Sequence, residues 1–123
     1  MSKGLEKLLK ERVTQRNEVI KKLYEIIDPL KDRLGKVTVI LYGSYARGDF
    51  NLWSDIDIIV ISEHFSKIKP LDRINKILDI LPPNVEAICL TPKEARNFFK
   101  KPWGHKILKE AKIIIDENRI IEK

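Results

Sequence analysis

The sequence predicts an α+β fold in which helices pack against a mixed β-sheet. Three features predict it: helical apolar spacing near the start, short β-branched segments in the middle, and a return to helical spacing afterwards. Helices and strands alternate without the strict strand–helix–strand repeat of a fully parallel sheet. The chain has 123 residues, a length typical of one domain, so we expect residues 1–123 to form a single domain.

The first predicted element is a long amphipathic helix over about residues 3–34. Its apolar residues recur at steps of three, four or seven positions, as on one face of a helix: Leu5, Leu9, Val13, Ile20, Leu23, Ile27 and Leu30. Asp28–Pro29 marks an end or a kink, because proline disfavours the helical conformation at the residue before it. Gly35 is typical of the residue that follows a helix.

The segments predicted to be strands are rich in β-branched residues and span residues 37–42, 55–61 and 85–90. Gly43–Ser44 breaks the first strand, and residues 45–54 are expected to form a turn of helix followed by a loop. Residues 70–81 are predicted to form a helix. Its apolar face would comprise Leu71, Ile74, Ile77 and Leu78. Residues 37–90 would thus form the core of the fold.

The remaining residues, 91–123, are predicted to add helices and a strand. Thr91 with Pro92 and Glu94 is the pattern of a capping box that opens a helix. Lys101–Pro102 would end that helix. A further helix at about 104–111 would lead into a strand at 112–116, with a turn and a possible hairpin partner after it at Arg119–Ile121.

The composition excludes several classes of protein. Hydrophobic residues make up 43% and charged residues 34%, which excludes wholesale disorder. No apolar run is long enough to span a bilayer, and the start lacks a secretory signal, so we expect a cytoplasmic protein without membrane contact. Cys89 is the only cysteine, which rules out an intramolecular disulfide or a cysteine metal cluster. His64 and His105 lack ligand-spaced neighbours, which disfavours a histidine-built zinc site.

The net charge of +6 is unevenly distributed along the chain. Residues 1–39 and 91–123 each carry +4, and residues 40–90 carry −2. Basic surfaces favour polyanions, so nucleic acid, nucleotide and acidic proteins are all candidate partners, while solvated helix faces are the simplest interpretation of most lysines. Nineteen isoleucines and seventeen lysines against one glutamine hint at a thermophile.

The residues most suggestive of chemistry are carboxylates placed in apolar strands. Asp55 and Asp57 lie two positions apart, so they project from the same face of a strand. Adjacent anions repel each other, and a hard cation such as magnesium resolves the conflict. Glu86 interrupts the next apolar strand. If it faces the two aspartates, three carboxylates can hold two ions.

Gly43–Ser44 supplies the second half of this pattern. A glycine after a buried strand, followed by a serine that opens a helix, directs backbone N–H groups and a hydroxyl toward an anion. Phosphate at one end and metal at the other together indicate nucleotide phosphoryl chemistry.

Gly43–Ser44, a ten-residue gap and Asp55–Ile56–Asp57 resemble the signature of the DNA polymerase β-like nucleotidyltransferase superfamily. The string Gly43-Ser44-Tyr45-Ala46-Arg47-Gly48, with Ser54-Asp55, resembles its branch of minimal nucleotidyltransferases (MNT) of archaea and bacteria. The resemblance covers about residues 37–90 well and the flanks only by element order.

The resemblance implies a polymerase β palm-like nucleotidyltransferase fold and transfer of a nucleoside monophosphate, AMP from ATP, to a hydroxyl acceptor. It implies that Gly43 and Ser44 bind the triphosphate and that Asp55 and Asp57 hold two Mg²⁺ ions. Glu86 would take the role of the third carboxylate, where the family usually has aspartate. Arg47 matches an arginine of the family string, and a guanidinium suits a triphosphate.

Each of these residues also has a structural interpretation. Asp55 and Asp57 could project into solvent at a strand end, and Glu86 could lie on an exposed edge beside a lysine. Arg47 could be a surface arginine. Tyr45 and Trp53 could stack on a nucleotide base, or they could pack in the core as aromatic residues near a core usually do.

Three functions remain open. The first is nucleotidyl transfer to a protein, with a helical partner of the HEPN type, as in the toxin–antitoxin pairs that the resemblance implies. In that case the partner supports the acceptor side of the site, and homodimerisation is the lesser option. The second is a non-catalytic nucleotide-binding or partner-docking module. The third is general nucleic-acid binding through the basic ends, which no recognition motif accompanies.

Overall fold

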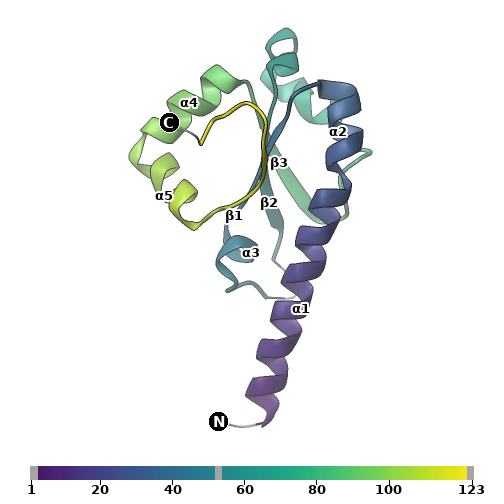
Figure 1. Ribbon diagram of the computed structural model, residues 1–123, viewed down its shortest axis with the longest axis vertical. Coiled ribbons are helices and arrows are strands. Elements are labelled where there is room, and N and C mark those ends of the chain that lie inside the picture. The colour runs from purple at the N-terminus through teal and green to yellow at the C-terminus, as the bar shows by residue number, and fades with distance from the viewer. Residues whose placement is uncertain (1–2, 52–53, 122–123) are drawn as a thin grey trace.

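The structure, a computed structural model, describes residues 3–51 and 54–121 (Figure 1). Its α-helices are α1 (Lys3–Glu25), α2 (Ile27–Leu34), α3 (Ser44–Arg47), α4 (Pro92–Lys100) and α5 (Pro102–Glu110). Its strands are β1 (Thr38–Tyr42), β2 (Ile56–Ile61), β3 (Val85–Leu90) and β4 (Lys112–Asp116). Two 3-10 segments, η1 (Glu63–Lys67) and η2 (Pro70–Lys76), join β2 to β3.

The strands form a four-stranded sheet in the order β3-β2-β1-β4. β1 runs antiparallel to both β2 and β4, whereas β2 and β3 are parallel, so the sheet is mixed. The parallel pair requires a long crossover, which η1 and η2 provide. The α+β class with a mixed sheet, expected from the sequence, is confirmed.

Each face of the sheet is covered by its own pair of helices (Figure 1). α1 and α2 cover the larger core, which is built around the buried residues Val39, Leu41, Ile58 and Val60. α4 and α5 cover the opposite face, where Ile40, Ile59 and Ile61 pack against Ala95 and Phe99. Ile59 and Ile61 follow Asp57 on its own face, so helices of this chain cover the apolar continuation of the carboxylate face.

The long N-terminal helix is interrupted, as Asp28–Pro29 predicts. α1 ends at Glu25 and α2 begins at Ile27. Pro29 cannot donate a hydrogen bond to the carbonyl of Glu25, and its ring clashes with that carbonyl, which places the break at Ile26. Gly35 ends α2 with a positive φ of 75° and donates its N–H to the carbonyl of Lys31.

The helix predicted over residues 70–81 is wrong. The structure has the 3-10 segment η2 followed by turns, and Leu71 and Leu78, two residues of the expected apolar face, are 92% and 58% exposed. Arg73 points inward instead and, like Ile77, is buried. Its guanidinium donates to the carbonyls of Ile68 and Cys89 and to the carboxylate of Glu94.

Replacing Arg73 with alanine should lower the free energy of unfolding by about 1.5–3 kcal/mol, because buried charge-assisted hydrogen bonds are lost. Its hydrogen bonds also hold the pKa of Glu94 below the usual 4.5, so this stabilisation is present above that value and is lost as the pH falls through the folded pKa. Urea unfolding measures both effects. Arg33→Ala, which removes an exposed ion pair with Asp79, is the matched control and should change much less.

The C-terminal elements follow the predicted order up to the last one. Thr91 and Glu94 form the predicted capping box of α4. Residues 119–121 do not form the expected hairpin strand, because Asp116 takes up the local backbone donors: its carboxylate accepts the N–H groups of Ile120 and Ile121 and the hydroxyl of Thr38. Asn118 then joins Thr38 to the carbonyl of Ile61.

Candidate active site

Three neighbouring strands place a tyrosine and two carboxylates in one row across the sheet. Tyr42 at the end of β1 is paired with Asp57 of β2, which is paired in turn with Glu86 of β3. Residues paired in this way project from the same face. Asp57 is partly buried and Glu86 is exposed. Asp55 lies just before β2 and is also exposed. The structure therefore brings Asp57 and Glu86 together, with Asp55 near them.

Asp57 lies where a negative charge is unfavourable. Burial raises the pKa of its carboxyl group, and the charges of Glu86 and then Asp55 raise it further. Tyr42 experiences the same surroundings, since burial raises the pKa of its hydroxyl and Asp57 and Glu86 add to the effect. A cation at this position would relieve the repulsion among these groups.

The turn that opens with Gly43–Ser44, called the phosphate turn, approaches Asp57 closely because its first residue is glycine. Gly43 precedes α3 with φ 76° and ψ −154°, a conformation that is essentially restricted to glycine. A Cβ atom at this position would lie 2.8 Å from Oδ2 of Asp57. The turn that opens with Gly43–Ser44 is therefore in contact with the central carboxylate, as a site that binds phosphate and metal together requires.

Gly43→Ala should both destabilise the protein, by roughly 1–3 kcal/mol of backbone strain, and displace the Asp57 carboxylate. We expect loss of nucleotide binding, measured by calorimetric titration. Gly48→Ala is the matched control, because Gly48 also has a positive φ, 89°, but open space around its missing Cβ. That variant should lose stability and keep nucleotide affinity; equal loss of affinity in both would contradict the role of Gly43.

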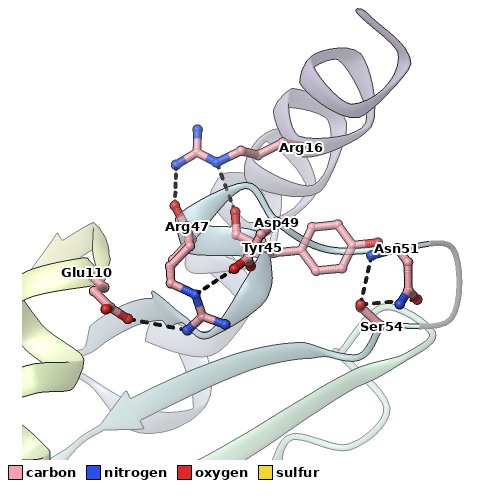
Figure 2. A network of polar contacts seen from close by, with 8 residues as sticks. Arg16, Tyr45, Arg47, Asp49, Asn51, Ser54 and Glu110 are labelled. Carbon is pink, nitrogen blue, oxygen red and sulfur yellow. Dashed lines mark hydrogen bonds and ion pairs between the residues drawn. The ribbon is translucent and has the colours of Figure 1, made fainter. Parts of the chain in front are cut away.

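Arg47, on the last turn of α3, is held by two exposed ion pairs. Its Nε atom lies 3.2 Å from Asp49, and its Nη1 atom lies 3.3 Å from Glu110 of α5 (Figure 2). Both carboxylates raise the pKa of the guanidinium. Exposed pairs of this kind contribute little to stability, so a polyphosphate could replace them. Binding of a triphosphate by Arg47 stays a prediction.

Helix α1 anchors the same turn from its other side. Arg16 donates from Nε to the carbonyl of Tyr45 at 2.9 Å and from Nη2 to that of Ala46 at 3.1 Å (Figure 2). Gln15 donates to the Tyr45 hydroxyl, and the Tyr45 ring stacks on that of Phe50, with 4.0 Å between the ring centroids. Tyr45 is thus a buried packing residue, whereas Trp53 lies outside the described residues.

The donor atoms at this edge suit a hard cation. Within residues 3–51 and 54–121, however, no three histidine, cysteine, aspartate or glutamate side chains converge closely enough to hold an ion by themselves. Metal binding by Asp55, Asp57 and Glu86 together stays a prediction. Magnesium is commonly held by one or two carboxylates together with substrate phosphates and water. The residues present fit an ion that binds along with a nucleotide.

Sequence reasoning missed two residues of this region. Tyr42 could be found from the sequence, because it immediately precedes Gly43 and lies two positions after Ile40, on the same face of the strand. No signal was available for Arg16, since its partners are backbone carbonyls some 30 positions away in the chain. Cys89 packs against the core, and burial raises the pKa of its thiol to about 11.

Comparison with known proteins settles the family. The sequence family described as a nucleotidyltransferase domain matches residues 23–121. The chain belongs to this nucleotidyltransferase family. A crystal structure described as "a putative nucleotidyltransferase from Sulfolobus solfataricus" has the same fold, with a TM-score of 0.63, 22% identity, and coverage of 83% of this chain and 84% of that one.

Curated relatives of this nucleotidyltransferase chain match it over different lengths. Two proteins of Methanocaldococcus jannaschii, each named "Putative protein adenylyltransferase", are 41% identical over 61 residues and 30% identical over 105 residues. These matches cover 49% and 78% of this chain and 60% and 71% of the relatives.

A third relative is considerably longer than this chain. A bifunctional uridylyltransferase/uridylyl-removing enzyme of Hydrogenovibrio crunogenus is 35% identical over 67 residues, which are 54% of this chain and 7% of that protein.

Among the described residues, no helix is both long enough and apolar enough to cross a membrane.

Proposed function

We propose that this nucleotidyltransferase domain moves AMP from ATP to a hydroxyl group of a protein. One observation carries the proposal: Asp57, which is paired with Glu86, lies in contact with the glycine that opens the phosphate turn. Family membership supports nucleotidyl transfer, and the names of the two archaeal relatives support a protein acceptor.

The roles of the residues follow from their places. Gly43 and Ser44 bind the triphosphate, and Arg47 pairs with its outer phosphates after exchanging its carboxylate partners. Asp55 and Asp57, with Glu86, would hold the divalent ions that such domains generally use; we propose two Mg²⁺ ions. When bound, these ions offset the negative charge that builds up on the phosphates.

The transfer exchanges one phosphate ester bond for another. The acceptor oxygen forms a bond to the α-phosphorus of ATP, the bond from that phosphorus to the oxygen bridging to the β-phosphorus breaks, and pyrophosphate leaves. The hydroxyl proton passes to Glu86, which is exposed and therefore accessible to an acceptor. Asp57, crowded by Glu86 and Asp55, is the group whose charge repulsion is relieved when the nucleotide and its ions are bound.

We further propose that the acceptor is a separately encoded helical protein of the HEPN type and that the pair forms a toxin–antitoxin system. The basic segments 1–39 and 91–123 support an acidic partner, because complementary charge speeds association.

Labelled nucleotide gives the direct test. The purified protein is incubated with magnesium, with each NTP labelled at the α-phosphate, and with the protein encoded by the neighbouring gene. We expect covalent labelling of the neighbour from ATP and release of one pyrophosphate per AMP. Absence of label on any protein, with intact nucleotide binding, would favour the non-catalytic module instead.

A further inference from the structure

Helix α1 carries an apolar stripe beyond the part that packs on the sheet. Its buried residues are Val19 and Leu23. Leu8 precedes Val19 by about three turns and Leu9 precedes Leu23 by about four, so both leucines face the same side as the buried pair. Yet Leu8 and Leu9 are each 44% exposed, and Val13 beside them is 61% exposed. The core-facing side of α1 therefore continues as surface.

Residues 3–16, most of which are exposed, are called the α1 arm. It extends past the end of the sheet at which α3 lies (Figure 1). A helical segment whose apolar face is exposed is marginal in water, because helical stability normally comes from packing of that face. An exposed apolar stripe rimmed by charge is the usual mark of an interaction site.

The groove beside the arm reaches the end of the sheet at which the candidate active site lies, on the opposite face from the carboxylate row. It has a volume of about 730 Å³ and is bounded by Lys7 and Lys10 of the arm and by Ile56 and Asn84 at the start of β2 and β3. Ile56 immediately follows Asp55, and its N–H is hydrogen-bonded to the carbonyl of Asn84. A segment lying in this groove would pass the end of β2 that Asp55 precedes.

Charge decides what kind of segment fits. The arm holds five basic residues and two acidic ones, a net charge of +3. Two copies of the chain that paired through their arms would bring these positive charges together, which disfavours self-association. The groove itself is lined by three lysines and two glutamates: Lys7, Lys10, Lys22, Glu11 and Glu18.

We infer that the α1 arm is the docking surface for an acidic amphipathic helix of the protein that receives the nucleotide. The inference rests on the proposed function for the identity of the partner. Apolar side chains of the incoming helix pack between Leu8, Leu9 and Val13, and its acidic side chains meet Lys7 and Lys10. The arm is also tied to the phosphate turn, because Arg16 at its end binds the carbonyls of Tyr45 and Ala46.

Two synthetic peptides test the surface on the full chain. Both form three helical heptads with leucine at the two core positions; one carries glutamate and the other lysine at the flanking positions. Fluorescence anisotropy should show binding of the glutamate peptide and at least about tenfold weaker binding of the lysine peptide. Hydrogen exchange at residues 5–13 should slow when the glutamate peptide binds.

Matched variants locate the binding. Leu8→Gln with Leu9→Gln, and separately Lys7→Glu with Lys10→Glu, should weaken the glutamate peptide about tenfold or more, since each removes one component of the surface. Leu71→Gln with Leu78→Gln, and Lys100→Glu with Lys106→Glu, change exposed residues elsewhere and should leave the affinity unchanged. A spin label at one end of the peptide should broaden the amide resonance of Ile56 and not that of Thr38, at the other end of the sheet.

Other outcomes would overturn the inference. These are equal affinity for the two peptides, affinity that the arm variants do not change, or a doubled solution mass that falls to the monomer in Leu8→Gln/Leu9→Gln. Failure of the proposed function is seen separately: arm variants should keep the ATP affinity of the wild type, and a chain without transfer activity can still bind the peptide through the arm.

Discussion

Replacing both Asp55 and Asp57 with asparagine should reduce nucleotidyl transfer by at least about 10²–10³-fold, the cost of removing a principal electrostatic group from an active site. Asparagine keeps the shape of each side chain and removes its charge, so the proposed divalent ions would lose two carboxylate ligands while the fold is retained. Transfer of labelled AMP and calorimetric binding of ATP with magnesium measure the two effects. Transfer at the wild-type rate would contradict the catalytic role of the pair.

Removing the charge of Asp57 should stabilise the protein in the absence of metal. The pKa of Asp57 is raised in the folded state, so folding favours its protonated form and the ionised form opposes folding. The gain in melting temperature from Asp57→Asn should therefore grow as the pH rises through that raised pKa and should vanish in acid. A gain in melting temperature of the same size at every pH would mean that the ionised carboxylate of Asp57 does not oppose folding.

Glu86→Gln should lower kcat by about 10²–10⁴-fold, the usual contribution of a general base, with a much smaller change in ATP affinity. Glutamine fills the same space beside Asp57 and cannot accept the proton of the acceptor. Single-turnover transfer with saturating ATP separates this step from binding.

Glu63→Gln is the control for Glu86→Gln, since Glu63 is an exposed glutamate just beyond the other end of β2. It should leave both kcat and ATP affinity unchanged. A fall in ATP affinity as large as the fall in kcat for Glu86→Gln would assign Glu86 to metal binding alone.

The parts of the fold that the sequence predicts well are those in which local preference and burial agree. The segment at β3 was expected at residues 85–90 and forms there, because β-branched residues and flanking prolines both favour a strand. The segment at residues 70–81 has the apolar spacing of a helix, but there the inward-facing position is taken by Arg73, which donates to the carbonyls of Ile68, just after η1, and of Cys89 on β3. A buried arginine satisfied by distant backbone cannot be recognised from spacing.

The candidate site can also be predicted from the sequence only in part. The motif identifies Gly43, Asp55 and Asp57, since spacing along one strand determines which side chains share a face. Pairing of Asp57 with Glu86 depends on the register of two parallel strands joined by a long crossover, which the sequence leaves undetermined.

The polar network of Thr38, Asp116 and Asn118 joins β1, β2 and β4 at the end of the sheet opposite to Asp57. Structural support and reactive groups thus occupy separate ends of the same strands. During divergence, substitutions at the carboxylate end can abolish turnover without unfolding the chain, whereas substitutions around Thr38 are removed by selection for folding. This architecture lets descendants of the enzyme persist as inactive binding proteins, a pseudoenzyme route that a protein with its catalytic groups embedded in its stabilising network does not have.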